Sequence, residues 1–304
     1  MKKNGFALVL TLWIVAMMSL ASVLYLSYAK KIVHNSRQLY EKLTLTFKAE
    51  STIELLKFYG STGAIKSTFM TNTLVQKKFP TFPKQISINS KKIVWDNTTI
   101  LLEDTGGLID ISDTDLLSNY IKGKNQDLKG KEDIIKDSIE DWLDENQFKQ
   151  LNGAEDLFYQ NFGYESRDRG YFASPEELFL LKGFEDFNET DKDDLLSLLV
   201  MTDSHRHNIL TLKSDLLQSM FSLSMSDVTQ LKHFKKSNDL VHFMSFFHTI
   251  YKENYDLEAD GALPSKIVRV TVNSKNKNIH KEIVLLIDFN IFFKKYFQVL
   301  NYKD

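Results

Sequence analysis

The first thirty residues contain a hydrophobic segment that limits what the whole chain can be. From Phe6 to Ala29 no side chain carries a charge. As an α-helix rising about 1.5 Å per residue, this segment is long enough to cross the roughly 30 Å hydrocarbon layer of a bilayer. We therefore predict a membrane-spanning helix at residues 6–29, with the remaining residues forming a domain outside the membrane.

A cleavable signal peptide is the main alternative for this segment. Lys2 and Lys3 provide a basic start, and Ser27-Tyr28-Ala29 provides small residues suitable for cleavage. The apolar core of a signal peptide is normally only about 7–15 residues long, so the length of this segment favours retention. Lysines precede and follow the segment, at 2–3 and 30–31, and they leave its orientation open.

The helical pattern continues beyond the span. Apolar residues recur at helical intervals at Ile32, Leu39, Leu43, Phe47, Ala49, Ile53 and Leu56. Tyr59-Gly60 provides a stop. We predict one rod of more than fifty residues, whose amphipathic second part at 30–60 packs on a domain.

Composition excludes several classes of function. A chain of 304 residues with 43% hydrophobic residues can bury a substantial core. Its net charge of −2 and the lack of a local basic patch argue against nucleic-acid binding. The absence of cysteine excludes disulfides, thiolate metal sites and thiol nucleophiles. The short motifs of serine hydrolases, phosphate loops, zinc proteases and dinucleotide-binding proteins are also missing.

Strand patterns flank a long helical region. After a polar loop between Thr71 and Gln85, we predict strands at Gln85–Asn89, Lys92–Trp95, Thr99–Glu103, Lys266–Val272 and Lys281–Phe289. The predicted fold class is α+β: a long N-terminal helix packed on a small antiparallel sheet. The first part of that sheet lies at 61–112 and the last at 263–304, and a large all-helical domain is inserted at 113–262.

Apolar spacing and capping signals predict individual helices in the insertion. Ile135, Ile139 and Trp142 share one helix face. Ser174–Glu177 has the pattern of a capping box with proline at the first helical position, and Gly183 closes that helix. Further helices are expected around residues 195–200, 216–221, 228–234 and 240–247.

Oxygen-bearing side chains flank one loop of the insertion, at Asp144, Glu145, Asn146, Glu155 and Asp156. Calcium takes six to eight such oxygen ligands. An EF-hand does not explain the group, because Lys149 stands where that motif has glycine. From the residues alone, a solvated acidic loop with helix caps is the better explanation.

Two further patterns are weaker. Asp104–Gly106 matches the active-site triplet of aspartic proteases, but that chemistry needs two carboxylates and no second triplet exists. We predict a turn before a strand. His205 and His207 flank Arg206 and could hold a metal from a loop, but no third ligand fits nearby, and we predict a surface loop.

The start of the chain resembles the type IV pilin class: a short basic leader ends at Gly5, and Phe6 opens an unbroken hydrophobic helix. The resemblance implies that a prepilin peptidase removes residues 1–5, cutting between Gly5 and Phe6, and methylates the new amino terminus. Most pilins carry a glutamate where this chain has Leu10. Because that glutamate neutralises the terminal amine of a neighbouring subunit inside the membrane, its loss implies a subunit at the front of the filament.

Other segments resemble the K-type minor pseudopilins of the type II secretion system. The resemblance runs through Asp104–Asp110, Asp141–Asn146, Gly153–Asp156, Tyr159 and Ser174–Gly183, and residues 142–177 are its most specific part. It implies calcium bound in the insertion, with Asp144, Asn146, Glu155 and Asp156 as candidate ligands. The missing carboxylate at Leu10 is also a trait of this family.

The resemblance implies a non-enzymatic subunit at the tip of the pseudopilus, which initiates or caps a filament that exports folded proteins across the outer membrane. The expected location is the bacterial inner membrane, single-pass, with a large periplasmic domain. Expected partners are the other minor pseudopilins, the major pseudopilin, the prepilin peptidase and inner-membrane lipid. Alternatives are a membrane-anchored periplasmic enzyme whose acidic cluster is catalytic, a minor subunit of a type IV pilus, and a secreted protein beginning after Ala29.

Overall fold

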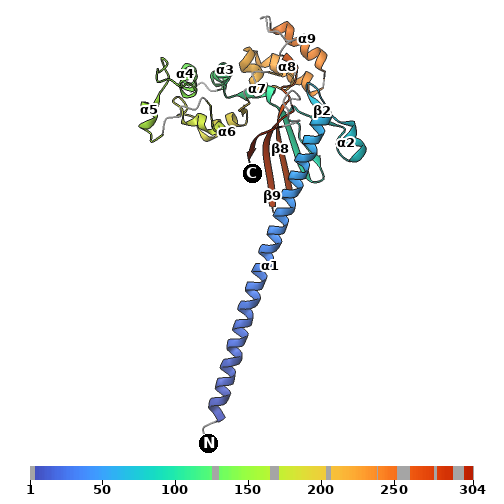
Figure 1. The fold of residues 1–304 in the computed structure, drawn as a ribbon, viewed down its shortest axis with the longest axis vertical. Helices are drawn as coiled ribbons and strands as arrows, with labels where there is room; N and C mark the ends of the chain where they lie inside the picture. Colours follow the sequence, from blue (N-terminus) through green and yellow to red (C-terminus); the bar gives the residue numbers. More distant parts are fainter. Residues whose placement is uncertain are drawn as a thin grey trace.

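The computed structural model describes residues 4–124, 130–164, 171–202, 207–237, 239–251, 261–276, 279–289 and 298–303. One long helix protrudes from a domain built around its C-terminal end (Figure 1). This helix, α1, runs from Asn4 to Thr62, 59 residues or about 88 Å at 1.5 Å per residue. The predicted single rod is confirmed.

Gly60 does not end α1, contrary to our prediction. The helix continues to Thr62, and Gly60 instead lies against the ring of Phe289. A β-carbon at residue 60 would come within 2.3 Å of the Phe289 Cε1 atom. Glycine at this position lets the ring of Phe289, just after β9, pack directly on the helix.

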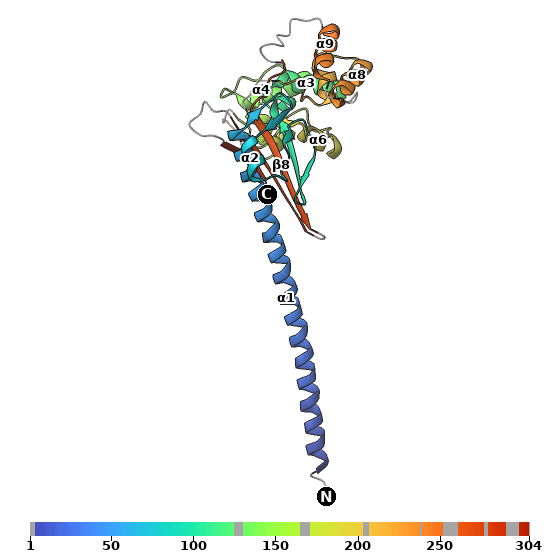
Figure 2. The same cartoon turned by 90° about the vertical axis from the view of Figure 1, so that its right-hand side faces the viewer.

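A five-stranded antiparallel sheet lies against the last turns of α1 (Figure 2). Its order is β10-β9-β8-β5-β4. The strands are β4 (Ile93–Trp95), β5 (Thr98–Asp104), β8 (Ile267–Asn276), β9 (Ile279–Asp288) and β10 (Gln298–Lys303). Strand β5 pairs with β8 from Thr98 opposite Ser274 to Asp104 opposite Val268. Because this pairing joins segments on either side of the helical region, the sheet holds the two ends of that region together.

The core beneath this sheet comes from alternating strand residues and one face of α1. The buried residues that meet there are Ala49, Ile53, Leu56 and Tyr59 from α1, and Val268, Val270, Val272, Ile283, Leu285 and Ile287 from β8 and β9. Alternation with period two explains why every second residue of β8 points into this core. The predicted α+β class, with a long helix on an antiparallel sheet and further helices, is confirmed.

A smaller sheet, ordered β1-β2-β3, consists of β1 (Ala64–Ile65), β2 (Phe69–Thr71) and β3 (Gln85–Ser87). Between β2 and β3 lies a short helix, α2 (Thr73–Lys78), where we predicted a polar loop. The Asn72 side chain accepts hydrogen bonds from the backbone N–H groups of Leu74 and Val75, which caps this helix. That cap and the burial of Val75 stabilise a helix too short to be predicted from periodicity.

The apolar stripe of α1 is split, and its first half does not pack on the domain. Ala49, Ile53 and Leu56 are buried as predicted, but the residues nearer the span are exposed, namely Ile32, Leu39, Leu43 and Phe47. The step of two residues from Phe47 to Ala49 turns the pattern by roughly 200° around the helix, so the two halves occupy different faces. The first half is therefore open to another molecule.

The insertion has its own hydrophobic core, separate from the core under the sheet. Its helices are α3 (Thr114–Lys124), α4 (Glu132–Leu143), α5 (Asp156–Gln160), η3 (Pro175–Leu180), α6 (Glu189–Leu196), α7 (Ser214–Phe221), α8 (Met225–Lys236) and α9 (Leu240–Ile250). Ile135, Ile139 and Trp142 are buried on one face of α4, as predicted. The insertion sits at the end of the domain away from the start of α1 (Figure 1).

Two local predictions in the insertion are wrong. The segment from Ser174 forms a 3₁₀ helix, and Glu177 accepts a hydrogen bond from the backbone N–H of Ala173 rather than completing a capping box with Ser174. Leu199 and Val200 form a strand, β7 (Leu199–Val200), instead of extending the helix before them. They pair in parallel with β6 (Ile109–Asp110), a contact between distant segments that helical spacing does not reveal.

Candidate functional site

The structure places the expected processing site at the free end of α1. Gly5 lies in the first turns of α1, and Phe6 and Leu10 are exposed there. From Phe6 onward, α1 has a mean hydropathy of 2.3 over its most apolar window, and none of that window is buried within the molecule. It is long and apolar enough to cross a membrane.

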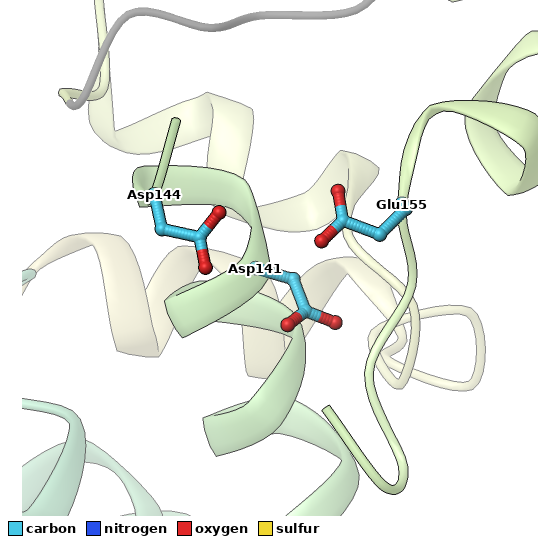
Figure 3. Close-up of side chains that lie close together, drawn as sticks. All are labelled: Asp141, Asp144 and Glu155. Atoms are coloured by element: carbon cyan, nitrogen blue, oxygen red, sulfur yellow. The ribbon is translucent and has the colours of Figure 1, made fainter. Parts of the chain in front are cut away.

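Three carboxylates converge where α4 ends and α5 begins. Asp141 lies in the last turn of α4, Asp144 caps its end, and Glu155 directly precedes α5 (Figure 3). One oxygen atom from each of the three lies within 4.8 Å of those of the other two. Three negative charges this close repel one another unless a proton or a cation is shared.

Asp141 is the most buried member of the carboxylate cluster. Its Oδ1 atom accepts a hydrogen bond of 2.9 Å from the backbone N–H of Gln150. Burial, followed by the charge of Asp144, raises the pKa of Asp141 above the ordinary range of an aspartate. Gly153 packs directly on this carboxylate, since a β-carbon there would fall 1.9 Å from Oδ2. The loop is thus folded tightly over Asp141.

Tyr159 closes the inner side of the cluster. Its ring packs edge-on against Trp142 with ring centroids 4.8 Å apart. Its hydroxyl is buried. Burial, with smaller contributions from the charges of Asp141 and Glu155, raises the pKa of Tyr159. The cluster therefore lies beside the core and not on an open surface.

The structure brings together only some of the metal ligands expected from sequence. Asp144 and Glu155 belong to the cluster, and Asp141 joins them. Asn146 instead donates its amide to Asp144, at 2.8 Å, and accepts from the backbone N–H of Phe148. Asp156 accepts from Gln147 Nε2 at 2.9 Å. Asp141 could have been found from its position three residues before Asp144, which places both on one side of a helix.

The donor set fits a hard cation. Carboxylate oxygens are the ligands that calcium prefers, and main-chain carbonyls and water commonly complete its shell. The cluster contains no histidine, which zinc or copper would favour. Asp141, Asp144 and Glu155 are thus the residues that would hold calcium in this chain.

The carboxylate of Asp104, from the protease-like triplet, is buried and accepts hydrogen bonds from several segments of the chain. Its Oδ1 atom accepts from the backbone N–H of Ser265 at 3.0 Å, and its Oδ2 atom from Asn208 Nδ2 at 2.7 Å and Thr211 Oγ1 at 3.2 Å. The next residues, Thr105–Gly107, form a 3₁₀ turn before β6, which matches the predicted turn before a strand. Asp104 thus joins the end of β5 to the middle of the insertion, at Asn208 and Thr211, and to the segment that follows the insertion, at Ser265.

Glu103, the residue before Asp104, also joins the sheet to the insertion. We call the contacts of Glu103 and Asp104 the junction. Arg269 of β8 contacts Glu103 Oε2 at 2.8 Å through Nε and 2.6 Å through Nη2, and Lys213 lies 3.4 Å from Oε1. Arg269 also donates to the carbonyl oxygens of Ser197 and Leu199 in the insertion. Burial opposes the ionised form of Glu103, but Arg269, Lys213 and Ser90 together lower its pKa below the ordinary range.

Of the histidine pair, the structure describes only His207, and His205 lies outside the described residues. His207 Nε2 contacts Asp113 Oδ2 at 2.9 Å, and its side chain is largely covered. His207 thus helps to fix the start of α3 beside the junction.

A long protruding N-terminal helix whose end packs on an antiparallel sheet is the architecture of pseudopilins. The chain is similar in structure to a chain of the GspK-GspI-GspJ complex from the type 2 secretion system of enterotoxigenic Escherichia coli. The match has a TM-score of 0.59 and 13% sequence identity, and it covers 88% of this chain and 98% of that chain. No family model and no curated protein matches the sequence. The expected pseudopilin fold, and with it the resemblance to type II secretion minor pseudopilins at the level of fold, is confirmed.

Proposed function

We propose that this chain is a minor pseudopilin of a bacterial type II secretion system. Residues 6–29 hold it in the inner membrane, and the sheet and insertion lie in the periplasm. The observation that carries the proposal is the continuous helix α1, which is able to span a membrane and is joined to a pseudopilin fold. The structural similarity to a chain of the GspK-GspI-GspJ complex supports it.

The leader and the span define how the subunit matures. A prepilin peptidase removes residues 1–5 and methylates Phe6. Leu10 supplies no carboxylate for the amine of a neighbouring subunit, and a lone amine in hydrocarbon is costly. The subunit therefore starts or caps the filament, before the major pseudopilin is added. The insertion lies at the end of the molecule far from Phe6 (Figure 1). Its bulk supports this position, because it obstructs the stacking of further subunits above this one.

A structural function is better supported than an enzymatic one. Asp104, the residue of the protease-like triplet, is 1% exposed and fully engaged by neighbours from three segments. A substrate could not reach it without breaking the junction. We therefore assign the chain no catalytic residue.

Contact with companion minor pseudopilins should run through the exposed half of the α1 stripe. Replacing Leu39 and Phe47 together by serine should lower co-purification of the companions with the detergent-solubilised chain at least tenfold. Each side chain is more than half exposed here, and burying a leucine or phenylalanine stabilises an interface by roughly 1.5–3 kcal/mol.

Val94→Ser on β4 is the matched control, since Val94 is also exposed but lies on the sheet edge. It should leave co-purification unchanged. Both variants should unfold like the natural chain, because exposed substitutions change stability by less than about 0.5 kcal/mol. Equal co-purification of the stripe variant and the natural chain would contradict this assignment.

We propose calcium as the occupant of the Asp141, Asp144 and Glu155 cluster. The cation would neutralise the mutual repulsion of the carboxylates and fix the loop between α4 and α5. These three residues bind it, while Gln150 and Gly153 hold Asp141 in place. Its function is to stabilise the insertion.

Calcium should therefore raise the thermal stability of the purified chain. At a concentration 100 times the dissociation constant the stabilisation is about 2.7 kcal/mol, or several degrees in melting temperature. Asp141→Asn should lose most of this shift, and Asp193→Asn on the exposed side of α6 should keep it. Melting temperatures that do not change between micromolar and millimolar calcium would contradict the proposal.

A further inference from the structure

Four large apolar side chains of the insertion are exposed around α5. Phe148 is 84% exposed, Leu151 89%, Leu157 80% and Phe162 62%. Single exposed apolar residues are ordinary, but a group this dense within fifteen residues is typical of an interaction surface. We name these four residues the α5 surface.

Hydrogen bonds hold the parts of the α5 surface near one another. Gln147 Nε2 donates to Asp156 Oδ2 at 2.9 Å, so Phe148 and Leu157, the next residue on each side, flank the same contact. In the turn after α5, Phe162 packs against Phe158 of the helix, with ring centroids 5.2 Å apart. The loop and the helix thus present their apolar side chains from adjoining positions.

The surroundings of this surface are acidic. Five carboxylates lie in or beside this loop, at Asp141, Asp144, Glu145, Glu155 and Asp156. They face two cations, Lys149 and Lys182, whose Nζ donates to the carbonyl oxygens of Asn152 and Gly153. By formal charge the surroundings stay negative even with a calcium ion at the proposed site. An apolar surface with this border is complementary to apolar side chains bordered by lysine or arginine. A second copy of this chain would bring the same negative charge, which disfavours pairing through this face.

The position of α5 favours a protein over a lipid bilayer as the partner. Helix α5 lies at the outer edge of the insertion, and the segment that can cross a membrane lies at the opposite end of the molecule (Figure 1). The membrane that holds residues 6–29 is therefore remote from the α5 surface. Anionic lipid would also be repelled by the acidic border.

We propose that the α5 surface docks a protein segment that presents apolar side chains between lysines or arginines. This inference goes beyond the proposed function, since neither membership of a pseudopilus nor calcium binding requires it. It concerns a face of the insertion that is separate from the α1 stripe.

The test uses the full chain in zwitterionic nanodiscs. Because the chain has no cysteine, Lys149→Cys takes one environment-sensitive fluorophore beside Phe148, and Lys236→Cys on the exposed end of α8 takes it in a control protein. The probe is a synthetic helical peptide of about 14 residues with leucines on one face and lysines on the other. We expect a saturable change in emission at position 149 with micromolar affinity, and none at position 236.

The double variant Phe148→Ser with Leu157→Ser, made in the labelled protein, should bind the peptide at least tenfold more weakly. Its melting temperature should not change. The same peptide with glutamates in place of lysines should not bind. Three results would overturn the proposal: equal responses at positions 149 and 236, unchanged affinity in the double variant, or a response to anionic vesicles but not to the peptide. Failure here leaves maturation at Gly5 and the α1 stripe contacts unaffected, so it is distinguishable from failure of the proposed function.

Discussion

Replacing Glu103 by alanine should destabilise the folded domain by about 3–5 kcal/mol. The change leaves Arg269 and Lys213 without the carboxylate that both contact, and an uncompensated buried charge is strongly unfavourable. Because Arg269 also binds the carbonyls of Ser197 and Leu199, the insertion should loosen from the sheet together with this loss. Chemical denaturation of the detergent-solubilised chain measures the effect.

Asp96→Asn is the matched control for Glu103. Asp96 pairs with Lys48 at 2.9 Å, but it lies at the surface, where such pairs contribute about 0–1 kcal/mol. Asparagine also tolerates the left-handed backbone of that position, where φ is 46°. If both variants lost equally little stability, the Glu103 junction would not hold the two parts together.

The pH dependence of Glu103 has a definite sign. Because Arg269 and Lys213 lower its pKa in the folded state, the stabilisation is complete above the ordinary carboxyl pKa and is lost as pH falls through the lowered value. Glu103→Gln should thus be much less stable than the natural chain at neutral pH. The difference should shrink in acid.

Replacing Asp104 by alanine should cost about 3 kcal/mol or more. It leaves the backbone N–H of Ser265 and one amide N–H of Asn208 without their acceptor, and each unsatisfied buried group costs about 1–3 kcal/mol. The Thr211 hydroxyl keeps its other acceptor, the carbonyl oxygen of Asn208. Asp104→Asn keeps the size and one acceptor oxygen, so it separates the role of charge from that of shape. Denaturation of both variants between pH 4 and 8 provides the measurement.

Asp104 should show the opposite pH dependence to Glu103. Burial raises the pKa of the Asp104 carboxyl. The hydrogen bonds that this carboxylate accepts lower the pKa by less, so the net shift is upward. The carboxyl of Asp104 therefore binds its proton more tightly in the folded state than in the unfolded state. Its contribution to stability falls as pH rises from the pKa of the unfolded state to the higher pKa of the folded state. Asp104→Asn should lose that dependence and become relatively more stable as pH increases. A difference in stability between Asp104→Asn and the natural chain that does not change with pH would contradict this account.

The sequence was sufficient for features that depend on long, regular patterns. The rod from residue 6 to beyond residue 56, the strands on either side of the helical region, and α4 with its buried Ile135 and Trp142 follow from periodicity alone. These patterns are reliable because one face of each element is buried along its whole length.

The rest depends on contacts between distant residues. The sequence predicts only that Asp104 is part of a turn. The fold shows that Asn208 and Ser265, over a hundred residues away in the sequence, donate hydrogen bonds to its carboxylate. The strand β7 exists because β6 lies beside it. The spacing of three residues from Asp144 points to Asp141, but its burial beneath Gly153 becomes visible only once the loop is folded back on α4.

The account as a whole depends on α1 being kept in the mature protein with its first residue at Phe6. Intact-mass analysis and amino-terminal sequencing of the chain isolated from membranes of a host that has a prepilin peptidase test this directly. We expect a chain that starts at a methylated Phe6, and a Gly5→Val variant that retains Met1. A mature chain that begins after Ala29, or a natural chain that keeps all of residues 1–5, would contradict the account.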